Sequence, residues 1–256
     1  MNTRRGAWAL VGLLWVVVLL NYLDRQVVFS LFPLLRNDLK LSDAQLGLVS
    51  SSFLWVYGLA SPLAGFLSDR LGHRRVILFS LVIWSAVTAL TGLVRDFGEL
   101  IAARALMGLS EACYIPAAMA FLSAHHTDAT RARAIGLHQS GIYCGIVLGG
   151  AGGGWMGEHY GWRPVFYLLG CVGLAYGLVL VRLLRGRPQA APEQRPGFWR
   201  TAGGLFATKG FPVVLTVFAL TSLASWLTYT WLPLFLYERF QMSLASAGFA
   251  STFYVQ

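Results

Sequence analysis

Five residues capable of binding or proton chemistry interrupt two long apolar segments. Asn21, Asp24 and Arg25 lie within segment 7–33, and Arg104 and Glu111 lie within segment 98–123. Charged side chains at membrane depth are costly unless they are paired or hydrated, so they should face a protein interior or a water-filled cavity. Arginines placed there can hold an anion. A carboxylate there can carry a coupling proton, because an apolar site disfavours its charged form.

Helical geometry places these charges at one level. Arg104 and Glu111 are seven residues apart, which is nearly two turns, so both project from one helix face about 10 Å apart. Asp24 precedes Pro33 by nine residues, and Glu111 follows Leu100 by eleven. At about 1.5 Å per residue, Asp24 and Glu111 lie within one turn of the same depth. The spacing therefore predicts a polar site shared by the two segments.

Two alternatives remain at this point. The first helix could end at Tyr22, which would leave Asp24 and Arg25 in an external loop, although apolar residues resume at Val27 and continue to Pro33. The four charged residues could also form a purely structural ion-pair cluster that joins the two helices.

The elements that must position these residues are membrane helices. Hydrophobic residues make up 56% of the chain and charged residues 12%, and the apolar residues come in blocks of about 20, the length that spans a bilayer. The sequence therefore predicts an all-α polytopic membrane protein. The expected spans are 7–33, 45–68, 76–94, 98–123, 134–156, 163–183 and 211–236, followed by an apolar stretch from residue 245.

The basic residues indicate topology rather than a nucleic-acid partner. With the N-terminus inside, thirteen of the twenty Lys and Arg residues fall in internal segments and five in external ones. This is the positive-inside pattern of a multi-pass protein of the cell (inner) membrane with a cytoplasmic N-terminus. No nucleic acid is expected, and the lipid bilayer is the main partner.

The chain divides into three parts. Residues 1–183 hold six spans, residues 184–210 are rich in Arg, Pro, Gly and Ala and predict a cytoplasmic linker, and residues 211–256 begin a second bundle. The motif Leu31-Phe32-Pro33-Leu34 recurs 200 positions later as Trp231-Leu232-Pro233-Leu234, and Leu41-Ser42 recurs as Met242-Ser243. Recurrence after a six-helix unit indicates a duplicated architecture.

Other features receive structural interpretations. Glycines at four-residue spacing in 134–156 should allow close helix packing, either static or in a rocking contact. We expect His138 and Gln139 at the membrane interface, and Tyr160-Gly161-Trp162-Arg163 as an interfacial anchor. Cys113, Cys144 and Cys171 are interpreted as small packing residues. His125, His126 and Asp128 are expected in a solvated internal loop rather than at a metal.

Motifs of catalysis are absent from the sequence. It contains no HExxH, GxSxG or GxxxxGK[ST] pattern, which excludes the commoner intramembrane protease, hydrolase and nucleotide-motor signatures. We therefore expect no enzymatic activity, no cofactor and no metal.

A short basic turn carries a family resemblance. The stretch GFLSDRLGHRRVIL resembles the signature loop between helices 2 and 3 of the major facilitator superfamily, G-x-L-x-D-R-x-G-R-[RK]. The resemblance implies a six-helix N-terminal bundle plus helix 7 and the start of helix 8. It also implies a cytoplasmic latch between the two halves of the transporter. The latch residues would be Gly65, Asp69, Arg70, Gly72, Arg74 and Arg75.

A second resemblance concerns the charged residues. Asn21-Tyr22-Leu23-Asp24-Arg25 with Arg104-x-x-x-Gly108-x-x-Glu111 is similar to the anion:cation symporters, and also to the spinster-like branch that handles lysolipids. The resemblance implies that Arg25 and Arg104, with Asn21 and Tyr22, bind the substrate. It also implies that Asp24 and Glu111 couple transport to protons. Ile146 follows Gly145 where the drug-antiporter signature has proline, which argues against that class.

The expected function is secondary active transport of a small organic anion by alternating access, as proton-coupled symport in a monomer. A spinster-like lysolipid transporter is the alternative within the family. A non-transporting membrane sensor or scaffold is the alternative from another class. A superfamily member normally has twelve helices and this sequence reaches the eighth. If the protein is truly this short, we expect the 256-residue chain to lack transport activity alone, because half of the cavity wall would be missing.

Overall fold

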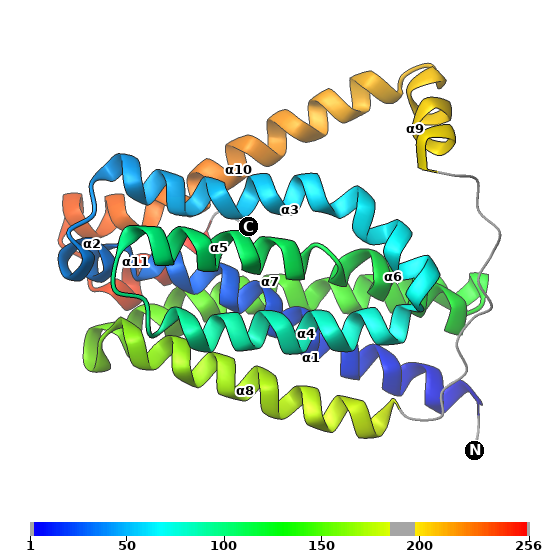
Figure 1. Ribbon diagram of the computed structural model, residues 1–256, viewed down its shortest axis with the longest axis horizontal. Helices are drawn as coiled ribbons and strands as arrows, with labels where there is room; N and C mark the ends of the chain where they lie inside the picture. The colour runs from blue at the N-terminus through cyan, green and yellow to red at the C-terminus, as the bar shows by residue number, and fades with distance from the viewer. Residues whose placement is uncertain (1–2, 185–197, 255–256) are drawn as a thin grey trace.

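The computed structural model describes residues 3–184 and 198–254, which form helices and no strand. The helices are α1 (Thr3–Ser30), α2 (Phe32–Leu39), α3 (Asp43–Leu71), α4 (His73–Thr91), α5 (Phe97–Glu111), α6 (Tyr114–His125), α7 (Asp128–Tyr160), α8 (Trp162–Leu183), α9 (Phe198–Ala207), α10 (Phe211–Phe240) and α11 (Leu244–Phe253). The long helices run side by side along one axis (Figure 1). About half of the predicted linker, residues 185–197, lies outside the described residues.

The long helices match the predicted membrane spans. Within the described ranges, six helical stretches are long and apolar enough to cross a membrane, with α5 and α6 counted as one stretch. The glycine-rich α7, 33 residues long, is less apolar but runs through the bundle beside α1 (Figure 1). The all-α polytopic fold predicted from the sequence is therefore confirmed.

The α3–α4 turn and the short helix α2 mark opposite ends of the bundle (Figure 1). The Gly72 end holds the turn between α3 and α4, and the α2 end holds the short helix α2 (Figure 1). At the turn, Gly72 has φ +92° and its N–H bonds to the Ser68 carbonyl oxygen. Ser68 Oγ lies 2.8 Å from His73 Nδ1. The tight turn predicted from the basic stretch is confirmed, and it occupies a single residue between the two helices.

Two predicted helices are interrupted. The first ends at Ser30 rather than continuing to Pro33, because the separate helix α2 begins at Phe32 with Pro33 in its first turn. The predicted span 98–123 breaks after Glu111, since Pro116 has no N–H to donate to the Ala112 carbonyl. The hydroxyl of Ser80 donates to the Ser110 carbonyl oxygen at 2.5 Å and so satisfies a backbone group beside the break.

The predicted repeat has a counterpart in the backbone. Among the described non-glycine residues, the positive φ angles are those of Lys40 (52°) and Gln241 (55°), which are 201 positions apart. Each ends a helix, and a serine cap follows two residues later: Ser42 at α3 and Ser243 at α11. The corner between α2 and α3 is thus repeated between α10 and α11.

Glycines of α7 allow two close helix contacts on different faces. A Cβ added at Gly149 would lie 2.7 Å from the Leu23 carbonyl oxygen of α1. A Cβ added at Gly150 would lie 2.5 Å from the Gly248 carbonyl oxygen of α11. Neighbouring residues of α7 therefore serve a contact within the first six-helix unit and a contact with the following helices.

Helix α10 packs against the bundle along only part of its length. Residues 212–224 are exposed, whereas Thr230, Pro233 and Leu234 are buried. In Figure 1, α10 lies close to α3 near the α2 end and diverges from it toward α9.

Candidate functional site

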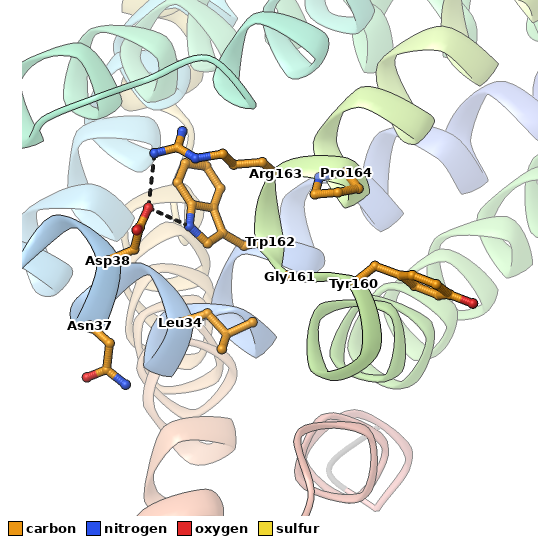
Figure 2. A pocket seen from close by; sticks show the side chains of 8 residues that line it. All are labelled: Leu34, Asn37, Asp38, Tyr160, Gly161, Trp162, Arg163 and Pro164. Atoms are coloured by element: carbon orange, nitrogen blue, oxygen red, sulfur yellow. Dashed lines mark hydrogen bonds and ion pairs between the residues drawn. The ribbon is translucent and has the colours of Figure 1, made fainter.

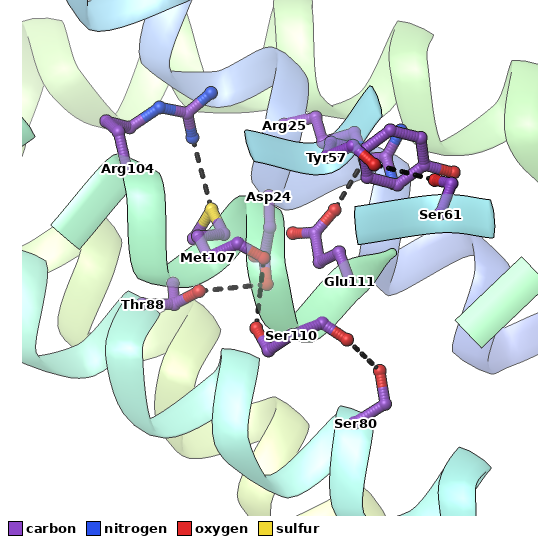
Figure 3. A network of polar contacts seen from close by, with 10 residues as sticks. All are labelled: Asp24, Arg25, Tyr57, Ser61, Ser80, Thr88, Arg104, Met107, Ser110 and Glu111. Carbon is purple, nitrogen blue, oxygen red and sulfur yellow. Dashed lines mark hydrogen bonds and ion pairs between the residues drawn. The ribbon is translucent and has the colours of Figure 1, made fainter. Parts of the chain in front are cut away.

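The predicted charged residues meet inside the bundle. Asp24, Arg25, Arg104 and Glu111 are all buried, with exposed fractions of 3, 7, 0 and 0%. Figure 3 shows them gathered between α1, α3 and α5. Asp24 and Arg25 lie within the continuous helix α1, so the alternative that places them in an external loop is wrong.

An ion pair links α1 to α5. Arg25 Nε donates to Glu111 Oε2 at 2.5 Å, and both side chains are buried. The second carboxylate oxygen of Glu111 and the Nη2 group of Arg25 have no hydrogen-bond partner in the described structure. Asn21, one turn before Arg25 on α1, is fully buried at the same site.

Arg104 is the least satisfied charge of the cluster. Its side chain is fully buried, yet its one hydrogen bond is from Nη1 to the Met107 sulfur, at 3.1 Å. Among the described residues, its Nε and Nη2 atoms have no partner. These two atoms form one edge of the guanidinium group, the kind of edge that binds a carboxylate with two parallel hydrogen bonds.

Asp24 has a partner that the sequence reasoning missed. Thr88 of α4 donates its hydroxyl to Asp24 Oδ2 at 3.2 Å (Figure 3). The other carboxylate oxygen has no partner in the part of the chain that the structure describes. A threonine in an apolar helix gives no sequence signal for such a contact, because threonine commonly bonds to its own helix backbone.

Aromatic rings surround the arginines. The Arg25 guanidinium carbon lies 4.7 Å from the Tyr22 ring centroid, 4.4 Å from that of Tyr57 and 5.0 Å from that of Phe53. The Arg104 guanidinium carbon lies 4.6 Å from the centroid of the same Phe53 ring. Such cation–π contacts partly replace lost hydration. Phe53 and Tyr57 were missed, because aromatic residues one turn apart are common on any membrane helix.

Gly108 explains the spacing of the α5 motif. A Cβ at this position would lie 2.7 Å from the Phe53 carbonyl oxygen and 3.2 Å from the Tyr57 backbone nitrogen. The backbones of α5 and α3 therefore touch at Gly108. This contact brings Arg104 over Phe53 and leaves Glu111, one turn further, within reach of Arg25.

The charged site lies between two apolar clusters. One cluster contains α1 residues from Leu10 to Val18 and the other contains α1 residues from Val27 to Phe29. The intervening turns of α1 carry the polar residues. The predicted common depth of Asp24 and Glu111 is thus matched by a polar layer between two apolar ones.

The predicted latch residues lie apart from this site. Asp69, Arg70 and Gly72 lie at or beside the turn of the Gly72 end, and Arg74 and Arg75 lie in the first turn of α4. Gly65 lies within α3, where an added Cβ would meet the Pro116 side chain of α6 at 3.8 Å. His73 Nε2 lies 4.0 Å from Asp69 Oδ1.

The expectation that His138 lies at the membrane interface is wrong. His138 is fully buried, and its Nε2 lies 2.9 Å from the Tyr114 hydroxyl. That hydroxyl donates to the Leu14 carbonyl oxygen at 2.9 Å, so Nε2 must donate to the tyrosine oxygen. The three residues join α7, α6 and α1 beside the break that follows Glu111.

His126 and the cysteines also differ from expectation. His126 is buried rather than solvated, with its ring 5.2 Å from that of Trp8 and its Nε2 3.3 Å from the Ala7 carbonyl oxygen. Cys144 and Cys171 are exposed on the helix surface and are not packing residues. In the described residues, no group of three or more His, Cys, Asp and Glu side chains could hold a metal.

A cleft at the α2 end is separate from the charged site. It has a volume of about 500 Å³ and includes Asp38, Tyr160, Trp162 and Arg163 in its lining. Asp38 accepts hydrogen bonds from Trp162 Nε1 at 3.1 Å and Arg163 Nη2 at 3.0 Å (Figure 2). Trp162 is buried. It therefore fixes α2 to the α7–α8 turn, and its predicted role as an interfacial anchor is wrong.

Comparison with known proteins identifies the family to which this architecture belongs. The family described as the Major Facilitator Superfamily matches residues 14–255. The chain therefore belongs to the Major Facilitator Superfamily, as the basic turn predicted.

Three similar proteins illustrate the relationship. An "MFS-type efflux pump" of Mycolicibacterium smegmatis is 31% identical over 95% of this chain and 58% of its own length. A "Probable galactarate/D-glucarate transporter" of Bacillus subtilis is 27% identical over 96% of this chain and 60% of its own length. A bacterial homologue of the human lysosomal transporter Spinster, solved in an inward-facing and unoccupied conformation, has a TM-score of 0.78 at 22% identity. That alignment covers 95% of this chain and 58% of the Spinster homologue.

The matches cover nearly all of this chain but only part of each relative. The chain spans about three fifths of the length of the curated relatives it matches.

Proposed function

We propose that this chain belongs to a secondary transporter of small organic anions, and that Arg104 binds a carboxylate of the substrate. The observation that carries the proposal is the free Nε and Nη2 edge of Arg104, buried beside a second arginine. An unpaired buried charge is strongly unfavourable unless a partner of opposite sign arrives. The similarity to a galactarate/D-glucarate transporter supports an acidic substrate.

Arg25 is proposed as the second substrate contact, in competition with Glu111. In the present structure Arg25 donates its Nε hydrogen bond to Glu111. A proton on Glu111 would weaken this ion pair and free the guanidinium group for the substrate. Asn21 and Tyr22, which lie on the same helix, are proposed to complete the binding surface.

The charge balance of the site supports coupling to a proton or another cation. Two arginines face two carboxylates, Asp24 and Glu111, so the formal charges cancel. A bound dianion such as glucarate would leave two buried negative charges, and one proton taken up by each of the two carboxylates would restore neutrality. Symport of the anion with a matching number of protons therefore avoids a net charge at membrane depth.

The proposed orientation follows from the basic residues at the Gly72 end. Arg70, Arg74 and Arg75 lie there, so we infer that this end and the N-terminus face the cytoplasm of the cell (inner) membrane. The division into bundle 1–183, linker 184–210 and second bundle 211–256 remains part of the proposal. So do alternating access, a monomeric state and the latch of Gly65, Asp69, Arg70, Gly72, Arg74 and Arg75.

Uptake into proteoliposomes tests the proposal. The reading frame that encodes this chain would be expressed with any sequence that follows Gln256, purified and reconstituted. Labelled glucarate should accumulate when an inward proton gradient is imposed, and lysophosphatidylglycerol should not move. Transport of the lysolipid alone would favour a spinster-like function. A protein that binds glucarate and never moves it would be a sensor, and transport would be refuted.

A further inference from the structure

Trp226 of α10 contacts the bundle close to the arginine site. Its indole N–H donates to Ser50 Oγ of α3 at 2.9 Å. Its ring lies parallel to that of Phe53, with an interplanar angle of 4° and a centroid distance of 5.9 Å. It also meets the Phe29 ring of α1 edge to face at 5.7 Å. One side chain from the segment after the linker thus touches two helices of the first six-helix unit.

The Phe53 ring connects Trp226 to both arginines. Arg25 and Arg104 place their guanidinium carbons 5.0 and 4.6 Å from its centroid. The backbone at Phe53 is held against α5 by the close approach at Gly108. Trp226 and both guanidinium groups therefore contact the same ring, on a stretch of α3 whose backbone packs closely against α5.

The contacts of α10 are graded along its length. From Trp226 onward, Thr230 lies 2.8 Å from Ser50 through their hydroxyl oxygens, and Glu238 forms an ion pair with Arg36 at the α2 end. On the other side of Trp226, residues 212–224 are exposed. In the described part of the chain, Trp226 thus lies where α10 stops packing against α1 and α3.

We propose that Trp226 closes the arginine site toward the α2 end, and that its stack on Phe53 is the closing contact. This inference rests on the proposed function for the meaning of the arginine site. A displacement of α10 from α3 would separate the two rings and break the Ser50 hydrogen bond in one movement. The same movement would uncover the face of Phe53 on which Trp226 stacks. Trp226 is thus a positioning residue. While its contact with Phe53 is made, the arginine site is closed to the α2 end, and when the contact is broken, the site is open to that end.

Thiol accessibility tests this closure without any substrate. In a background with Cys113, Cys144 and Cys171 replaced by serine, Ser61→Cys places a reporter one turn from Tyr57 toward the Gly72 end. Asn37→Cys, exposed on α2, identifies in parallel the membrane side on which the α2 end lies. A membrane-impermeant thiol reagent is then added from that side, and the rate of labelling at position 61 is measured.

The expected result is slow labelling from the α2 side in the parent protein. Trp226→Ala should raise that rate about tenfold, since it removes an aromatic stack and a hydrogen bond. Trp226→Phe, which keeps the stack, should stay within about twofold of the parent. Leu223→Ala, at an exposed position of α10, is the matched control and should change nothing.

Three results would overturn the inference. They are an unchanged rate in Trp226→Ala, an equal rise in Trp226→Phe, or an equal rise in the Leu223→Ala control. If Trp226→Ala is not recovered as a folded protein, Trp226→Leu fills the space without the stack and should raise the rate in the same direction. Because labelling needs no substrate, a failed closure leaves the transport proposal standing, and failed transport leaves the closure result intact.

Discussion

Arg25 of α1 and Glu111 of α5 form a buried ion pair, with Nε and Oε2 2.5 Å apart. Arg104, two turns before Glu111, lies at the same site without a carboxylate partner. One arginine is thus held by the protein, and the other has a free edge. The sequence alone did not distinguish Arg25 from Arg104, whereas the structure gives the two arginines different partners.

Arg104→Lys should weaken substrate binding about 10- to 100-fold, because an ammonium group cannot reproduce a two-bond guanidinium edge and each such charged bond contributes about 1.5–3 kcal/mol. The dissociation constant of glucarate, measured by titration calorimetry, checks this. Arg95→Ala is the control, since Arg95 is exposed at the α2 end. Wild-type affinity in Arg104→Lys would reduce Arg104 to a structural charge.

Glu111→Gln should remove the dependence of uptake on the proton gradient while counterflow exchange of substrate persists. The amide is neutral at every pH, so the Arg25 ion pair can no longer be switched by a proton. Initial uptake rates over a pH series, compared with those of Asp24→Asn, would show which carboxylate carries the proton. If both variants keep the pH profile of the parent protein, neither Asp24 nor Glu111 carries the coupling proton.

Gly108→Ala should destabilise the bundle by about 1–3 kcal/mol, because the new Cβ overlaps the α3 backbone at Phe53. The matched control is Gly136→Ala on α7, where an added Cβ meets nothing within 4 Å. This control should be neutral or stabilising by up to about 1 kcal/mol, since alanine favours helix over glycine. Thermal unfolding in detergent measures both, and equal melting temperatures would contradict the close contact.

Tyr114→Phe should cost about 1–3 kcal/mol, because it leaves the buried Leu14 carbonyl and His138 Nε2 without their partner. Tyr143→Phe serves as the control, since Tyr143 is 57% exposed. Chemical unfolding followed by circular dichroism gives the comparison. Substrate affinity should be unchanged in the Tyr114 variant, and a large loss of affinity would place this cluster in the binding site instead.

The sequence was most informative where charged residues interrupt apolar segments. Charged side chains at Asp24, Arg25, Arg104 and Glu111 have few explanations at membrane depth, so their convergence could be predicted from helical rise alone. The Gly72 turn and the six-helix unit followed for similar reasons, since hydropathy and charge distribution constrain membrane helices strongly.

The neighbours of these charges could not be predicted in the same way. Phe53, Tyr57 and Trp226 are ordinary residues of a membrane helix, and only their placement by Gly108 and α10 distinguishes them from lipid-facing aromatics. His138 was misplaced because its depth was judged from its distance to the segment end. The break after Glu111 depends on Pro116, whose effect lies at the carbonyl four residues earlier.

The binding of an acid against its neutral counterpart tests the central claim most directly. Purified protein from the complete reading frame would be titrated with glucarate and with glucitol, which lacks both carboxylates. The account predicts binding of glucarate, no detectable binding of glucitol, and loss of glucarate binding in Arg104→Ala. Equal binding of the two compounds, or unaltered glucarate binding in Arg104→Ala, would contradict a buried guanidinium edge that recognises the substrate carboxylate.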